Sequence, residues 1–193
     1  MHLPLMGIIS RDAGGGYTAS ATNFDGTNDY MLRGGDLTGN ADGKQITVSF
    51  WLNLNGGDGS NLQLLQNASN HITIFRASGN KINVNVYNAA GASIALLKPG
   101  TLYTAGSTWL HVLASVDAGV SNSGYMYIAY VAKVSAYDPL LNDNIDFTDT
   151  DWGVGSTTLG ASKLNACLSE FWVSNEYIDL SVEANRRKFI DAS

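Results

Sequence analysis

Carboxylates are the side chains of this sequence whose spacing can be compared directly with a known chemistry, the hydrolysis of a glycosidic bond. That reaction needs a proton donor and a nucleophile, held about 5 to 5.5 Å apart in retaining enzymes. The chain has three glutamates, Glu170, Glu176 and Glu183, and their spacing places no pair of them on one strand. A glycosidase that uses aspartates is the alternative that this pattern leaves open.

Other catalytic patterns do not occur in the sequence. It contains no G-x-S-x-G motif, no Walker A phosphate loop and no Cys/His spacing of a zinc site. His2, His71 and His111 are far apart along the chain, and no nucleophile has a visible base partner. The sequence therefore predicts a protein that is not an enzyme.

The segment 138–153 is a long acidic loop that offers oxygen ligands to a hard cation. The candidate metal ligands are Asp143, Asp146, Asp149 and Asp151. Calcium is the candidate ion, because it prefers carboxylate and carbonyl oxygens. The spacing does not match an EF-hand, and a solvated acidic loop without a metal is the alternative interpretation.

Sugar binding requires an aromatic platform for the apolar face of the sugar and polar partners for its hydroxyl groups. Two strand-like segments carry such side chains on their polar faces, and the candidate glycan-binding residues are Trp51, Asn83, Asn85 and Tyr87. These residues form one site if their strands are neighbours. An ordinary wet sheet face, with Trp51 packed under a loop, is the alternative.

Short strands must position these residues, since the apolar positions alternate along most of the chain. The clearest strand is QITVSFWLNL at 45–54, whose apolar side chains fall on one face at every second position. The content of 21 glycines and 3 prolines also fits many strands joined by turns. Only 181–190 has helical spacing, with Ser181 as the expected N-cap. The pattern predicts an all-β, antiparallel two-sheet sandwich with a short C-terminal helix.

The first 16 residues differ from the rest of the chain. They end in three glycines, and the apolar side chains of this segment are Leu3, Leu5, Ile8 and Ile9. We interpret 1–16 as an N-terminal arm with a Gly-rich joint, which docks on the domain itself or on a neighbouring chain, and 17–193 as the sandwich domain. The segment lacks the basic region and the apolar core of a signal peptide.

Charge and cysteine content narrow the range of partners. The net charge of −6 disfavours nucleic acid as a partner, and no apolar run reaches the roughly 18 residues of a membrane span. The single cysteine, Cys167, excludes an internal disulfide and favours folding in a reducing cytoplasm.

Several motifs stand in an order that resembles the laminin-G-like members of the concanavalin A-like lectin/glucanase superfamily. In chain order these motifs are FDGTNDYM, ITVSFWLNLN, TWLHVLASVD, VGSTTLGAS and LNACLSEFWVSNEYIDLSVEANRRKFI. The resemblance covers about residues 20–190 and implies a jelly-roll sandwich. It also implies that Phe24 packs in the core, that Asp25 and Gly26 build a turn, and that His111 is a structural, hydrogen-bonded histidine.

The resemblance also implies a biological setting, because phage and prophage virion proteins often carry laminin-G-like domains. We therefore expect a non-enzymatic virion module, such as a capsid decoration or a fibre or tail component, assembled in the host cytoplasm. Its expected partners are other virion proteins or copies of itself, engaged partly through 1–16, with a surface glycan as a second ligand. A carbohydrate-binding lectin or adhesin domain of a secreted, extracellular protein is the alternative.

Overall fold

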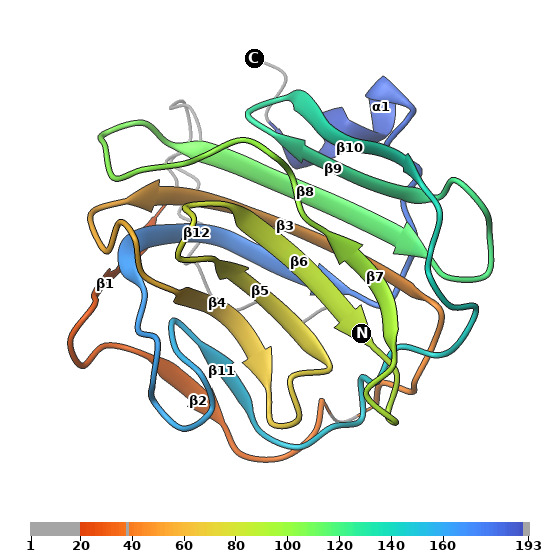
Figure 1. Ribbon diagram of the computed structural model, residues 1–193, viewed down its shortest axis with the longest axis horizontal. Coiled ribbons are helices and arrows are strands. Elements are labelled where there is room, and N and C mark those ends of the chain that lie inside the picture. Colours follow the sequence, from red (N-terminus) through yellow and green to blue (C-terminus); the bar gives the residue numbers. More distant parts are fainter. Residues whose placement is uncertain (1–19, 38, 191–193) are drawn as a thin grey trace, which may run out of the picture.

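Two antiparallel sheets of six strands each form the protein, and a short helical segment follows them (Figure 1). The computed structural model describes residues 20–37 and 39–190. Sheet A has the strand order β1-β12-β3-β8-β9-β10, and sheet B has the order β2-β11-β4-β5-β6-β7. The predicted all-β sandwich is therefore confirmed.

The strands are short, as the turn-rich sequence predicts. Those of sheet A are β1 (Ala21–Asp25), β3 (Gln45–Leu54), β8 (Leu110–Asp117), β9 (Gly124–Ile128), β10 (Val131–Tyr137) and β12 (Asn165–Ser174). Those of sheet B are β2 (Met31–Arg33), β4 (Leu62–Asn67), β5 (Ile72–Arg76), β6 (Ile82–Tyr87), β7 (Ser93–Leu97) and β11 (Trp152–Val154).

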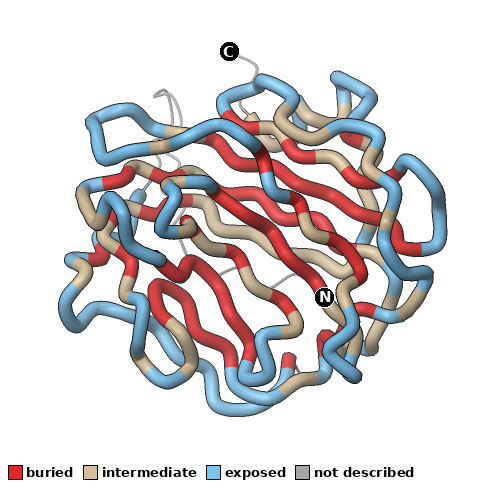
Figure 2. Tube along the Cα trace, viewed as in Figure 1, coloured by how far each residue is buried: buried red, intermediate tan, exposed pale blue. Residues whose placement is uncertain are grey.

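The core lies between the inner faces of the two sheets, where the alternating apolar residues meet. In β3 the buried inner side chains are Ile46, Val48, Phe50, Leu52 and Leu54. Figure 2 shows the same arrangement along the trace, with buried residues in the strands and exposed ones in the surrounding loops. Removal of these side chains from water is the main stabilising term of such a fold.

The FDGTNDY segment forms the turn that its sequence predicts. Asp25 Oδ1 accepts hydrogen bonds from the backbone N–H groups of Thr27, at 2.7 Å, and Asn28, at 3.1 Å. Phe24, just before the turn, is fully buried in the core, whereas Tyr30 is partly exposed. The turn carries the chain from β1 of sheet A to β2 of sheet B.

Three elements differ from the sequence prediction. The sequence pattern predicts a strand at 125–131, another at 154–160 and an acidic loop up to 153. The structure has an additional strand, β10, after β9. It places β11 at Trp152–Val154, and 155–160 forms no strand. The C-terminal helix is only α1 (Glu183–Arg186), followed by the 3-10 turn η1 (Arg187–Phe189). Ser181 is not its N-cap: Val182 holds that position without a side-chain hydrogen bond, because the Ser181 hydroxyl donates to Asp179 instead.

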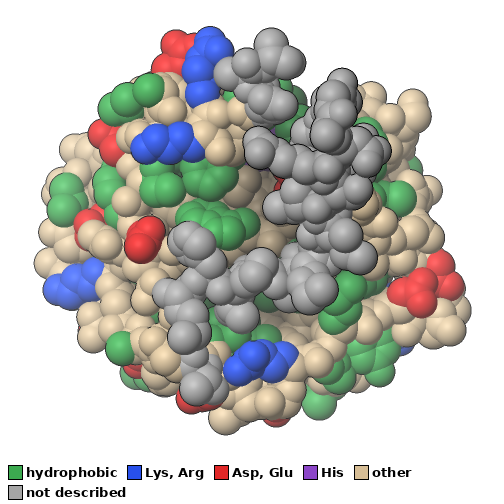
Figure 3. Space-filling view, turned by 180° about the vertical axis from the view of Figure 1, so that it is seen from behind, with side chains coloured by type: hydrophobic (Ala, Val, Ile, Leu, Met, Phe, Trp, Pro, Cys, Tyr) green, Lys and Arg blue, Asp and Glu red, His purple; other side chains and the backbone are tan. Residues whose placement is uncertain are grey.

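The outer face of sheet A carries the C-terminal segment. The Thr47 hydroxyl donates to the Glu176 carbonyl at 2.8 Å, and the Ile178 N–H donates to Ser115 Oγ at 3.1 Å. The rings of Trp172 and Phe189 lie 5.4 Å apart. In the view of this side, hydrophobic side chains lie in several groups separated by other side chains (Figure 3).

The outer face of sheet B points in the opposite direction, toward the viewer in Figure 1. The predicted arm at 1–16 and its boundary with the domain lie outside the described residues. No helix in the described ranges has the length and apolarity needed to cross a membrane.

Candidate functional site

The outer face of sheet B gathers three of the four predicted glycan-binding residues. In β6 the core takes Ile82, Val84 and Val86, so the alternation of the strand turns Asn83, Asn85 and Tyr87 outward. These three residues therefore line one face of one strand, as the sequence predicts.

Neighbouring strands add polar and aromatic side chains to this face. Asn85 is paired with Thr73 of β5, and Asn83 is paired with Phe75. Thr73 and Phe75 are paired in turn with residues of β4. We call this surface the amide face, and it consists of Gln63, Gln66, Thr73, Phe75, Asn83, Asn85 and Tyr87.

The amide face is closely packed. Asn83 and Asn85 are only 6% and 4% exposed, although they point away from the core. Gln63 is held in place, because its Nε2 donates to the Leu65 carbonyl at 2.6 Å and to the Thr73 hydroxyl at 2.7 Å. This packing distinguishes the face from the ordinary wet sheet face that the sequence left as the alternative.

Two acceptor atoms of the amide face are left without partners. Within residues 20–37 and 39–190, the Oδ1 atoms of Asn83 and Asn85 are buried and accept no hydrogen bond. A buried polar atom without a partner costs about 1–3 kcal/mol. A ligand that donates hydroxyl groups to these two oxygens would recover that free energy.

A cluster of His71, Asp146 and Asp149 lies at the Tyr87 end of the amide face. One ligand atom of each residue lies within 4.8 Å of those of the others. His71 directly precedes β5, and its carbonyl accepts the Tyr87 N–H at 2.7 Å. Its Nδ1 lies 2.7 Å from Asp146 Oδ2, so the imidazole and this carboxylate are already in direct contact.

The other two predicted metal ligands do not join this cluster. Asp143 accepts hydrogen bonds from the side chain of Asn88 at 2.8 Å and from the N–H of Asn144 at 2.8 Å. Asp151 accepts the N–H of Gly35 at 3.1 Å. The set of four aspartates is thus divided, and only Asp146 and Asp149 come together, because the loop turns its other carboxylates toward backbone and amide donors.

The chemistry of the cluster decides which ion it suits. Calcium prefers an all-oxygen set of six to eight ligands, whereas an imidazole with two carboxylates suits first-row divalent ions such as Zn²⁺ or Mn²⁺. The Ser69 N–H donates to Asp149 at 2.7 Å, and the Thr148 N–H donates to Asp146 at 3.1 Å. These bonds hold both carboxylates in place. Because the set contains an imidazole and only two carboxylates, it fits a divalent transition ion better than calcium.

Trp51 lies on the other sheet and cannot share a site with the amide face. It belongs to β3 of sheet A, between the core residues Phe50 and Leu52, and therefore points to the outer side of that sheet. The condition for one site with Asn83, Asn85 and Tyr87 was that the strands be neighbours, and β3 and β6 are not. The predicted four-residue glycan site is wrong in this respect.

Trp51 packs instead in an aromatic cluster with His111 and Tyr130, with ring centroids 4.9 Å and 6.4 Å away. His111 is buried, and its Nε2 lies 3.0 Å from Ser49 Oγ. Burial lowers the pKa of His111 from its usual 6.5 to about 4. The predicted hydrogen-bonded structural histidine is thus found at this position.

Sequence reasoning missed His71, Gln63 and Gln66. Strict alternation along β4 would turn Gln63 and Gln66 to opposite faces of the sheet. The register shift between Gln63 and Leu65 pairs them with Phe75 and Thr73 of β5 and so brings both to the outer face. His71 and Asp146 are 75 positions apart, and no local signal joins residues at that separation.

Comparisons with solved structures reveal related folds at low identity. A heptameric SAP-like pentraxin from Limulus polyphemus has a TM-score of 0.60 and 14% identity over 89% of this chain and 80% of that chain. Domains LG4-5 of the mouse laminin alpha1 chain have a TM-score of 0.58 and 12% identity. The match covers 91% of this chain and 48% of the laminin chain.

A structure of botulinum neurotoxin type C has a TM-score of 0.54 and 11% identity. The match covers 76% of this chain and 35% of the toxin chain. The cell entry of that toxin is described as dependent upon interaction with two ganglioside molecules. The chain thus spans less than half of the laminin and toxin chains. At such identities these likenesses show the fold alone, and no curated protein matches the chain.

A sequence profile of the laminin-G type, described as the concanavalin A-like lectin/glucanases superfamily, matches residues 25–180. This range begins at Asp25, the last residue of β1, and ends after β12, so it includes every strand except β1 and the whole amide face. The chain therefore belongs to the laminin-G-like domains of the concanavalin A-like lectin/glucanases superfamily.

Proposed function

We propose that this domain is a non-enzymatic binding module that holds a glycan on the amide face of sheet B. The observation that carries the proposal is the pair of buried, unpartnered Oδ1 atoms of Asn83 and Asn85. Sugars are rich in hydroxyl donors and have apolar C–H faces, so they match acceptors that lie between Phe75 and Tyr87. Both aromatic side chains are half-buried.

The nearby cluster adds a cation to this proposal. A divalent ion held by His71, Asp146 and Asp149 would supply a positive charge at the Tyr87 end of the face and polarise an acidic or hydroxyl group of the glycan. The toxin whose printed description names gangliosides shares this fold, which supports a glycan as the ligand class.

A glycan array tests the proposal when it is read with EDTA, with Ca²⁺ and with Zn²⁺ or Mn²⁺. We expect binding that Asn85→Ser weakens at least about tenfold, since one lost hydrogen bond of about 1.4 kcal/mol corresponds to that factor. The matched control is Trp51→Phe, on the opposite sheet, which should leave binding unchanged. If Trp51→Phe lost binding and Asn85→Ser kept it, the site would lie on sheet A instead. An array on which the protein binds no glycan would refute the proposal.

We further propose that the module belongs to the surface of a phage or prophage virion, as a capsid decoration or a part of a fibre or tail, assembled in the host cytoplasm. The support is the resemblance of the closing stretch EANRRKFIDA to the domain ends of such proteins, together with the single cysteine. Other virion proteins or copies of this chain would be its partners, engaged partly through 1–16. A secreted, extracellular lectin or adhesin is the second candidate, which the laminin likeness favours.

A further inference from the structure

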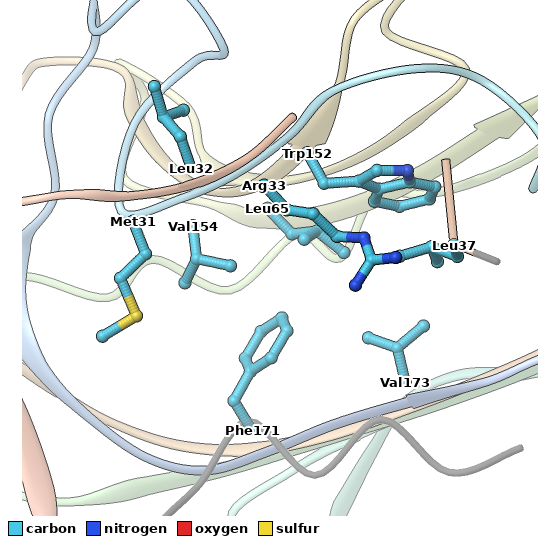
Figure 4. Close-up of a pocket in the computed structure, with 9 residues that line it drawn as sticks. All are labelled: Met31, Leu32, Arg33, Leu37, Leu65, Trp152, Val154, Phe171 and Val173. Carbon is cyan, nitrogen blue, oxygen red and sulfur yellow. The ribbon is translucent and has the colours of Figure 1, made fainter. Parts of the chain in front are cut away.

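An apolar cavity of about 130 Å³ lies between the sheets, where β2 and β11 face β12. Buried side chains form its wall on sheet B, among them Leu65 of β4 and Trp152 and Val154 of β11. Phe171 and Val173 of β12 form the opposite wall, and Figure 4 shows both pointing across the gap. Walls of this kind exclude water and favour an apolar occupant.

The rim of the cavity differs from its interior. It lies along β2, the edge strand of sheet B in the described ranges. Met31 of this strand is 38% exposed, and Arg33 is exposed as well. Arg33 is the only charged residue among the described residues that line the cavity. The cavity therefore combines an apolar interior with a cationic rim.

The local structure holds the Arg33 side chain at this rim. Its Nε donates to the Asp36 carbonyl at 2.9 Å, and the strand register pairs Arg33 with Trp152. In the view of Figure 4 the guanidinium extends into the gap between Trp152 and Val173. A guanidinium stays charged at any ordinary pH, and its planar set of N–H donors matches the geometry of a carboxylate.

We propose that this cavity binds a small carboxylic acid with an apolar body, of the aryl or short-chain alkyl carboxylate class. The apolar body lies between β11 and β12, and the carboxylate contacts Arg33 at the rim. An apolar cavity of about 150 Å³ in a protein accommodates a benzene molecule, so 130 Å³ limits the body to about one ring or its aliphatic equivalent. The rings of Trp152 and Phe171 favour an aromatic body.

The charge at the rim distinguishes the acid from its uncharged and cationic analogues. An alcohol of the same size makes the same apolar contacts but forms no ion pair with Arg33, and an amine is repelled by it. The inference does not depend on the glycan proposal, because the cavity lies on the inner side of sheet B and the amide face on its outer side.

Titration of the full-length chain with benzoate, benzyl alcohol and benzylamine tests the inference. The methyl NMR signals of Leu65 and Val154 report binding in the cavity itself, since both residues line it. We expect benzoate to bind about fivefold more tightly than benzyl alcohol, the factor that corresponds to an exposed ion pair of about 1 kcal/mol. Benzylamine should bind most weakly.

Variants of Arg33 separate its charge from the shape of the cavity. Arg33→Gln should weaken benzoate binding to the level of benzyl alcohol and leave benzyl alcohol binding unchanged, whereas Arg33→Lys should retain part of the preference. A change that merely loosened the rim would weaken both ligands alike. The matched control is Arg187→Gln, which removes an exposed guanidinium from the C-terminal segment and should change neither affinity.

A variant that fills the cavity provides a second test. Met31→Trp adds volume at the partly exposed rim and should weaken benzoate and benzyl alcohol alike, by at least about tenfold. Equal affinities for benzoate and benzyl alcohol in the wild-type protein, or a preference that persists in Arg33→Gln, would overturn the inference. A wild-type protein that binds neither ligand, or a folded Met31→Trp variant with unchanged affinities, would also overturn it.

Discussion

At the scale of single residues, burial makes His111 a pH-sensitive group outside the candidate site. Its pKa falls to about 4 because burial penalises the charged imidazolium. The groups that face it are the Ser49 hydroxyl and the rings of Trp51 and Tyr130, and none of these carries a charge near neutral pH. The folded protein therefore holds His111 neutral where the unfolded chain begins to protonate it.

The sign of the pH effect follows from this difference. Between about pH 6.5 and 4 the unfolded state binds more protons at this residue, so the free energy of unfolding decreases as the pH falls through this window. Each pKa unit corresponds to about 1.4 kcal/mol, which gives roughly 3 kcal/mol over the window. His111→Gln keeps a partner for Ser49 but cannot titrate.

Urea unfolding at a series of pH values checks this prediction. We expect the variant to lose stability less steeply than the wild-type protein below pH 6.5, and the two slopes to coincide above about pH 7. Parallel curves over the whole range would mean that His111 does not titrate with folding.

Alternation predicts the direction of a side chain but not its distant neighbours. It correctly placed Asn83, Asn85 and Tyr87 on one outer face, because the period of two is local. It grouped Trp51 with them, although Trp51 lies on the other sheet. The contact of His71 with Asp146 likewise arises only because the acidic loop passes the start of β5.

At the scale of elements, Gly155 joins the end of β11 in sheet B to β1 in sheet A. Its φ is +80°, and a Cβ atom there would lie 2.4 Å from Cε1 of the buried Phe24 ring. Gly91 has a similar φ of +77° but no atom within 4 Å of its Cβ position. The two glycines therefore separate the cost of the backbone conformation from the cost of the clash.

We expect Gly91→Ala to lower the free energy of unfolding by about 1–2 kcal/mol, the cost of the left-handed backbone. Gly155→Ala should cost roughly 1–3 kcal/mol more, since Phe24 must move within a packed core. Chemical denaturation of both variants measures the difference. Equal losses would mean that Phe24 adjusts freely and that β1 is packed loosely against sheet B.

Strands with unusual turns are the elements that the sequence did not reveal. Strand β10 follows β9 through Ala129 and Tyr130, which have φ values of +49° and +65°. Hairpin turns of this kind normally use Asn-Gly or Asp-Gly, so no turn signal separated the two strands. Tertiary packing overrides the local preference, since the Tyr130 ring contacts Trp51 and His111.

At the scale of the whole molecule, the two sheets give the domain two distinct sides. The amide face and the His71 cluster belong to sheet B, whereas the chain leaves for 1–19 from β1 at the edge of sheet A. The order of the sequence motifs predicted the sandwich but not this division, because the assignment of strands to sheets depends on long-range pairing.

This division leads to a prediction about the particle that we propose contains the domain. In a cryo-EM map of the virion, the β1–β12 edge should face the particle and the amide face should point to solvent, where a host glycan can reach it. Deletion of 1–16 should remove the domain from the particle. A free monomer whose distribution is unchanged by the deletion would instead favour the secreted lectin, and an amide face buried against the capsid would exclude its use as a glycan site in the virion.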